Sequence, residues 1–179
     1  MSLFVLPDLF VHPEKLFIGI FGDLAFFYDL NVLGNRHVGN NVRILLINNG
    51  KGNEFRNYSH PCYSLGEEVD RYIAAAGHYG NMSRKLVKDY AMDLGYEYLT
   101  AGNKDEFNAL VDRFLASEIT EKPVLLEVFT QTEDESKALE QIMNVILDSK
   151  LTLKNTIKQT VKNLLGKNGY EIVRKIVHR

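Results

Sequence analysis

The sequence predicts an α/β fold, a doubly wound parallel sheet with helices on both faces, followed by a basic amphipathic helix. Three observations lead to this prediction. Short apolar runs alternate with helical patterns at the spacing of strand–helix–strand units. The apolar runs are continuous, as in strands that are buried on both faces. The last thirty residues differ from the rest of the chain in charge.

The first part of the chain predicts a buried strand, a helix, a second buried strand and a loop, at residues 16–21, 26–37, 42–47 and 50–66. Both strands are unbroken apolar runs that end in polar or glycine residues. The loop is rich in Gly, Asn, Pro and Ser. It is longer than most connections, and long loops often carry function.

The second part predicts a short helix, a helix, a short strand, a helix, a buried strand and a helix, at residues 67–80, 83–94, 96–100, 103–116, 124–129 and 132–148. Ser83 and Asn103 are of the residue types that cap helix N-termini. Gly95 suits the end of the helix before it. Crossovers between such strands are right-handed, which favours helices on both faces of the sheet.

Charge and composition divide the chain into a domain at residues 1–149 and a basic helical tail at residues 150–179. The tail holds eight basic residues and one acid in a chain of net charge −2. We expect it to dock on its own protein or a neighbouring subunit rather than on an anionic membrane. Nucleic-acid binding is not expected, because the basic residues are confined to the tail and no binding motif accompanies them.

The same composition favours a cytoplasmic protein. Apolar residues make up 45% of the chain and charged residues 25%, which is a normal globular balance. No apolar run is long enough to cross a membrane, and the start lacks the pattern of a secretory signal. A single cysteine, Cys62, excludes an internal disulfide framework.

Two polar motifs follow the first two strands, where ligands of parallel sheets bind. Asp23 offers a carboxylate oxygen, Asn49 an amide oxygen and Lys51 a backbone carbonyl, a set of hard oxygens suited to Mg²⁺. The helix that starts near Ala25 directs N–H groups to the same place, and these favour a phosphate. Each motif alone has an ordinary explanation, since Asp often caps a helix and Asn-Asn-Gly is common in turns.

Together the motifs resemble the diphosphate-binding domain of thiamine-diphosphate-dependent enzymes, which is Rossmann-like. Their signature is Gly-Asp-Gly followed, after a similar gap, by Asn-Asn. The string Gly22-Asp23-Leu24-Ala25-Phe26-Phe27-Tyr28-Asp29-Leu30-Asn31 is similar to the synthase family of menaquinone biosynthesis and to acetolactate-synthase-like enzymes. The resemblance runs from about residue 16 to residue 129. Leu24 replaces the third glycine, and Lys51-Gly52-Asn53-Glu54-Phe55 stands where the family has Gly-Gly-Gly-Ile-Phe.

The resemblance implies thiamine diphosphate and Mg²⁺ as cofactors. Asp23, Asn49 and the Lys51 carbonyl would bind the metal, and Phe55 would line the substrate side. The residues that would lie against the cofactor, mainly through backbone, are Gly22, Leu24 and Ala25. His60 in the long loop could also face substrate.

The resemblance also implies a carboligase or decarboxylase that acts on a 2-oxo acid. The glutamate that activates the cofactor belongs to a separate pyrimidine-binding domain, of the same or a neighbouring subunit, so no catalytic residue is assigned in this chain. We therefore expect a fragment of a larger homo-oligomeric enzyme, inactive by itself. The alternative is a noncatalytic α/β interaction module derived from such a domain. A further alternative is a Mg²⁺-dependent phosphate-binding domain with another cofactor.

Overall fold

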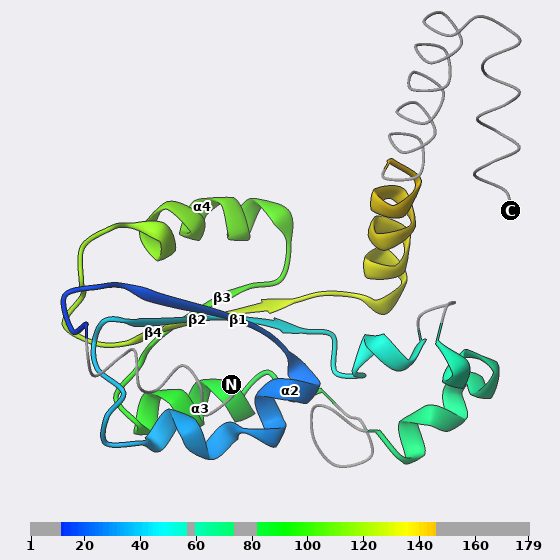
Figure 1. Cartoon of the computed structure of the whole chain (residues 1–179), viewed down its shortest axis with the longest axis horizontal. Coiled ribbons are helices and arrows are strands. Elements are labelled where there is room, and N and C mark those ends of the chain that lie inside the picture. The colour runs from blue at the N-terminus through cyan, green and yellow to red at the C-terminus, as the bar shows by residue number, and fades with distance from the viewer. Residues whose placement is uncertain (1–11, 57–59, 74–81, 146–179) are drawn as a thin grey trace, which may run out of the picture. The chain divides into compact units, whose positions relative to one another are not determined.

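The computed structural model of the chain describes residues 12–56, 60–73 and 82–145. Four strands form one parallel sheet in the order β1-β2-β4-β3 (Figure 1), namely β1 (Phe17–Gly22), β2 (Val42–Asn48), β3 (Glu97–Ala101) and β4 (Val124–Phe129). The chain steps outward from β1 to β2 and β3, then returns to place β4 between β2 and β3. The predicted doubly wound parallel sheet is confirmed.

Helices cover both faces of this sheet. α2 (Asp23–Tyr28) and α3 (Leu86–Asp93) lie on one face, and α4 (Lys104–Leu115) lies on the other (Figure 1). The side that each helix takes follows from the direction of its crossover. Steps toward β3 place their right-handed crossovers on one face, and the return step to β4 places α4 on the opposite face.

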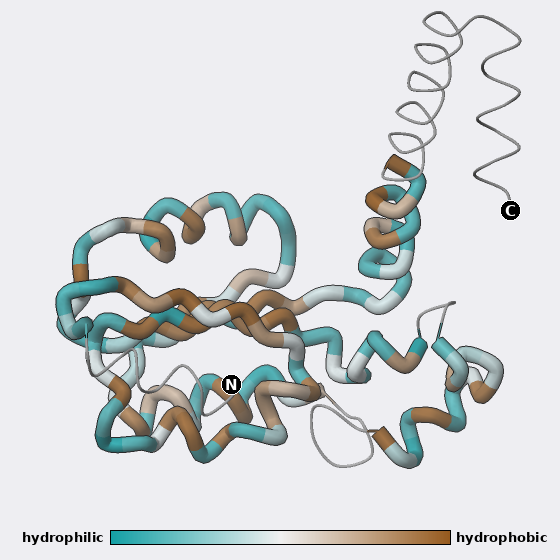
Figure 2. Tube along the Cα trace, in the orientation of Figure 1, coloured by the Kyte–Doolittle hydropathy of each residue, from teal (hydrophilic) through white to brown (hydrophobic). Residues whose placement is uncertain are grey.

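Two apolar cores lie against the two faces, and the strands between them are strongly hydrophobic (Figure 2). Successive residues of β4 serve different cores, because side chains alternate along a strand. Leu125 packs with Ile44 and Leu46 under α2 and α3, while Leu126 packs with Phe114 of α4. The continuous apolar runs of β2 and β4 are thus explained by burial on both sides.

The first strand departs from its prediction as a buried strand. Phe17 and Phe21 pack against the core under α2. On the other face, however, Ile18 and Ile20 are 46% and 68% exposed. Among the described residues β1 pairs only with β2 and is thus an edge strand of the sheet, and α4 packs against the β3 and β4 side of the sheet. Burial of both faces was therefore wrong for β1, since the outcome depends on strand order.

The helix predicted at residues 26–37 is broken into two pieces and starts earlier. α2 begins directly after β1, and the 3₁₀ helix η1 (Leu30–Gly34) follows it. Asp29 lies between them with φ −109° and ψ 22°, outside the helical range. In a 3₁₀ helix residues three apart share a side. This geometry lets Leu30 and Leu33 pack together against the core.

The long connection predicted as a loop at residues 50–66 contains 3₁₀ helices. These are η2 (Asn53–Arg56) and η3 (Pro61–Arg71). η3 is kinked at Gly66, whose φ of 54° is accessible to glycine at little cost. The helix predicted at residues 67–80 is therefore present only as the end of η3, and residues 74–81 lie outside the described residues.

The predicted cap of α4 at Asn103 is confirmed, whereas α3 begins later than predicted, at Leu86, with Lys85 rather than Ser83 at its N-cap. The Ser83 hydroxyl accepts hydrogen bonds from the backbone N–H of Lys85 and of Leu86, at 3.3 and 3.2 Å. The Asn103 side chain accepts from the N–H of Glu106 at 2.9 Å. The Glu106 carboxylate in turn accepts from the N–H of Gly102 at 2.7 Å. α4 begins where the Asn103 side chain satisfies a free backbone donor, and the Ser83 hydroxyl bonds to donors of the turn that leads into α3.

The chain divides into two compact units, Met1–Thr132 and Glu133–Arg179. Residues 132–145 are helical, which confirms the described part of the helix predicted at residues 132–148. The boundary predicted after residue 149 and the basic tail at residues 150–179 lie outside the described residues. Within the part of the chain that the structure describes, no helix is both long and apolar enough to cross a membrane.

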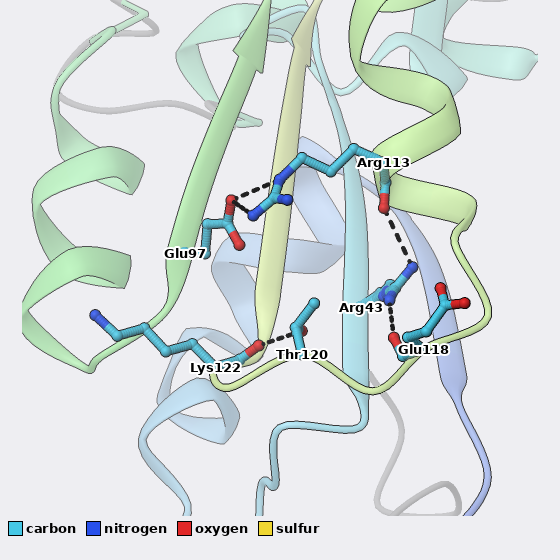
Figure 3. Close-up of polar contacts among 6 residues, drawn as sticks. All are labelled: Arg43, Glu97, Arg113, Glu118, Thr120 and Lys122. Atoms are coloured by element: carbon cyan, nitrogen blue, oxygen red, sulfur yellow. Dashed lines mark hydrogen bonds and ion pairs between the residues drawn. The ribbon is translucent and has the colours of Figure 1, made fainter.

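A buried arginine joins β2 to the C-terminal end of α4 (Figure 3). Arg43 is 0% exposed. Its guanidinium donates to the backbone carbonyl of Phe114 and, at 2.6 Å, to that of Glu118. A cation is favourable here because carbonyls at a helix C-terminus lack partners and carry partial negative charge. The neighbouring Arg113 instead pairs with Glu97 at the surface, at 2.5 Å.

Replacing the buried arginine is expected to be much more damaging than replacing the exposed one. Arg43→Ala should lower the free energy of unfolding by about 3 kcal/mol, because it leaves a cavity and removes the donors of buried carbonyls. Arg113→Ala breaks only a surface ion pair and should cost less than about 1 kcal/mol. Urea unfolding followed by circular dichroism measures both. Equal losses would contradict the role given to Arg43.

Candidate functional site

The two polar motifs meet at the carboxyl edge of the sheet. Asp23 begins α2 directly after β1 and is 2% exposed. One oxygen of its carboxylate accepts a hydrogen bond from the N–H of Leu24 at 2.7 Å. The other oxygen accepts from the N–H of Lys51 at 3.1 Å. This second bond joins the end of β1 to the turn after β2, as the positions of the motifs at parallel strand ends predict.

The Asn-Asn-Gly motif forms a turn held by its own side chains. The Asn48 side-chain oxygen accepts from the N–H of Gly50 at 3.0 Å, and the Asn49 oxygen accepts from the N–H of Lys51 at 2.9 Å. Each asparagine thus bonds to the backbone two residues further on, which is the usual asparagine turn. Gly50 has φ 76°, which other residues rarely adopt.

The turn brings together two of the three oxygens predicted as metal ligands. The backbone nitrogen of Lys51 is shared between the Asp23 carboxylate and the Asn49 amide oxygen. Both oxygens therefore lie within hydrogen-bonding distance of one atom. The third predicted ligand, the Lys51 carbonyl, stays a prediction. Among the described residues, no three His, Cys, Asp or Glu side chains cluster as a metal site would require, so a site here would combine one carboxylate with neutral oxygens.

The residues predicted to contact the cofactor lie at the same edge of the sheet as this turn. Gly52 has φ 60°, and a Cβ at this position would lie 3.3 Å from a methyl of Leu24. The Leu24 side chain therefore packs closely against Gly52 in the turn. Gly22 and Ala25 are exposed at the same edge. A Cβ added to Gly22 would meet no atom within 4 Å, so the space beside its backbone is open.

The side chain of Lys51 points to η3 through an ion pair. Its ammonium lies 3.9 Å from the carboxylate of Asp70, which also pairs with Arg56 of η2. These side chains are partly exposed, so the pairs contribute little stability individually. They do connect the turn after β2 to both 3₁₀ helices.

Phe55, predicted to line the substrate side, lies beside a histidine. The rings of Phe55 and His60 meet edge to face with centroids 5.0 Å apart. The His60 Nδ1 accepts from the N–H of Cys62 at 3.1 Å, so in the neutral ring the proton is on Nε2. Both rings are half-buried. The structure thus pairs the two loop residues singled out from the sequence, and their facing of a substrate stays a prediction.

No family model matches this chain, but several known proteins are similar to it. They carry the name 2-succinyl-5-enolpyruvyl-6-hydroxy-3-cyclohexene-1-carboxylate synthase. The protein from Bacteroides fragilis is 32% identical over 126 residues, that from Phocaeicola vulgatus 35% over 128, and that from Christiangramia forsetii 30% over 134. The chain is a relative of these synthases.

The similarity covers most of this chain but a small part of each synthase. It extends over 70% of the chain and 21% of the Bacteroides fragilis synthase, and over 72% and 22% for Phocaeicola vulgatus. The chain therefore spans about a fifth of the length of the synthases it matches. The resemblance stated from the sequence motifs is confirmed at the level of the family.

One buried residue next to the turn, Glu127, was not among the residues predicted from the sequence motifs. Glu127 of β4 is 0% exposed. It accepts hydrogen bonds from the Asn48 amide and the Tyr98 hydroxyl, both at 2.6 Å. Burial raises the pKa of Glu127, and the two hydrogen bonds, together with the positive charge of Arg84, oppose part of that rise. The signal in the sequence was a single acid within the apolar run of residues 124–129.

The two glycines of the site should respond differently to an added methyl group. Gly52→Ala is expected to lower the free energy of unfolding by about 1–2 kcal/mol, because alanine is strained at positive φ and would press on Leu24. Gly22→Ala is the matched control. Gly22 has φ −78° and open space beside it, so the change should stay within about 0.5 kcal/mol. Thermal or urea unfolding of both variants measures the difference. A Gly52→Ala variant as stable as the parent would contradict the close packing of the turn.

Proposed function

We propose that the chain binds Mg²⁺ and the diphosphate of thiamine diphosphate, as the diphosphate half of a site for 2-oxo acid chemistry. One observation carries the proposal. The Asp23 carboxylate and the Asn49 amide oxygen, 26 residues apart in the chain, approach the same backbone nitrogen. Such convergence of hard oxygens at parallel strand ends suits a divalent cation that shares phosphate ligands.

The donor set fits this cofactor in kind and in charge. Mg²⁺ is commonly held by one or two carboxylates together with substrate phosphates, and Asp23 supplies one carboxylate. Asn49 and the Lys51 carbonyl would add neutral oxygens. Gly22 and Ala25 are exposed beside the metal residues, so their backbone would be able to approach the diphosphate. Leu24 would contact the cofactor from the start of α2.

The proposed reaction class is carbon–carbon bond formation or decarboxylation of a 2-oxo acid. When bound, thiamine diphosphate supplies the carbon nucleophile and the electron sink for this chemistry. The similarity to the named synthases supports the class. Because the chain spans about a fifth of their length, we infer that catalysis needs a pyrimidine-binding domain from the same or a neighbouring subunit, in a homo-oligomer.

Removing the proposed metal carboxylate should abolish cation binding. Mn²⁺ serves as a paramagnetic probe of the Mg²⁺ site, and its binding to the chain is followed by electron paramagnetic resonance with thiamine diphosphate present. Asp23→Ala should raise the Kd at least about tenfold, or about 1.4 kcal/mol, because it removes the one charged ligand that we propose the protein supplies. The control Asp112→Asn removes an exposed carboxylate of α4 and should leave the Kd unchanged.

Three outcomes would count against the proposal. Undiminished Mn²⁺ binding by the Asp23→Ala variant would show that the cation lies elsewhere. A parent chain that binds neither Mn²⁺ nor thiamine diphosphate at millimolar concentrations would favour the alternative, a noncatalytic interaction module derived from such a domain. Binding of Mn²⁺ that requires inorganic diphosphate but not the thiamine portion would instead favour a different phosphate cofactor.

A further inference from the structure

A buried carboxylate bridges three adjacent strands close to the proposed metal turn. Glu127 lies on β4 opposite Leu46 of β2 and Thr100 of β3. One of its oxygens accepts from the Asn48 amide at the end of β2, and the other from the Tyr98 hydroxyl on β3. The side chain is 0% exposed, and both donors are neutral. No ion pair with Glu127 occurs among the residues that the structure describes.

A buried carboxylate whose hydrogen-bond donors are both neutral is costly, even though the charge of Arg84 offsets part of that cost, and an apolar side chain would fill the same space without it. Burial accordingly raises the pKa of Glu127. The fold gains no attachment of a helix from this group, since its partners lie on neighbouring strands that already pair with β4. Its specific effect is on the orientation of Asn48.

That orientation decides the shape of the turn. Because the Asn48 amide nitrogen donates to Glu127, its oxygen is directed to the other side, where it accepts from the N–H of Gly50. The backbone carbonyl of Asn48 is also fixed by β4, since it accepts from the N–H of Thr130 at 3.1 Å. With the Asn48 side chain and carbonyl both held, the turn that follows presents the Asn49 oxygen and the Lys51 amide toward Asp23.

We propose that Glu127 is a positioning residue, which fixes Asn48 and thereby holds the Asn49 and Lys51 turn in the geometry that binds the divalent cation. The inference rests on the proposed function for the identity of the bound group. It assigns Glu127 no contact with the cation or with substrate. Partners that orient metal ligands in this way typically change metal affinity by about 10–100-fold when they are removed.

The test measures Mn²⁺ binding to the chain with thiamine diphosphate present, together with urea unfolding. Glu127→Leu keeps the volume but removes the acceptor for Asn48, and should raise the Kd at least about tenfold. Glu127→Gln keeps a carbonyl oxygen for Asn48, and should stay within about threefold of the parent. Tyr98→Phe removes the other partner of Glu127 and serves as the control. It should lower stability without changing the Kd, because Tyr98 bonds to Glu127 and not to Asn48. Loss of stability alone would thus not account for weaker Mn²⁺ binding.

If Glu127→Leu does not fold, a second pair of variants tests the same hydrogen bond by exchanging its donor and acceptor. Asn48→Asp places two carboxylates face to face and should weaken Mn²⁺ binding by at least about tenfold. Adding Glu127→Gln restores one donor and one acceptor at the parent net charge, and should bring the Kd back to within about threefold.

The outcomes separate the two proposals. A parent that binds Mn²⁺ while Glu127→Leu binds equally well, or a double variant without rescue, overturns the positioning role and leaves the proposed function standing. A parent that does not bind Mn²⁺ overturns the proposed function. In the metal-free chain, the amide NMR shifts of Gly50 and Lys51 then test the positioning role by itself. Unchanged shifts in Glu127→Leu would overturn it.

Discussion

The hydrogen bond between the Lys51 amide and the Asp23 carboxylate sets the geometry of the whole carboxyl edge. It joins the first residue after β1 to the turn after β2, and it depends on parallel pairing that sets Gly22 opposite Ile47. In an antiparallel pair the same two chain positions would lie at opposite edges. The core stabilises this arrangement, because Phe26 of α2 packs in the same cluster as Ile44 and Leu46 of β2. The site therefore depends on strand direction before it depends on any ligand residue.

The fold could be predicted where the signal is local. Asn103 caps α4 through its own side chain, and β4 has the predicted bounds because Pro123 and the apolar run define it. The prediction failed where strand order decides the result. The apolar run predicts burial of Ile18 and Ile20, yet they belong to an edge strand, on the face that α4 covers only at β3 and β4. No pattern within residues 16–21 carries that information.

The site shows the same division. Asp23 and Asn49 could be found from the sequence because their spacing places them after consecutive strands, and the turn geometry follows from asparagine and glycine chemistry. Glu127 could not be assigned a partner, because Asn48 lies 79 residues away along the chain. In the sequence, Glu127 stands out only as an acid within an apolar strand. A charge in an apolar strand does not by itself indicate a functional site. Arg43 is also a charge in a buried run, but it serves the helix rather than the site.

The two buried charges differ in what satisfies them, and this difference indicates their roles. Arg43 meets the carbonyls at the end of α4, where a positive charge complements the helix dipole and ties a helix to the sheet. Glu127 accepts hydrogen bonds from neutral donors within the sheet, where only the charge of Arg84 offsets part of its burial and these bonds attach no helix. An apolar residue would serve the sheet at least as well at position 127. A carboxylate there is explained by the amide it orients, and that amide belongs to the turn on which Asp23 and Asn49 converge.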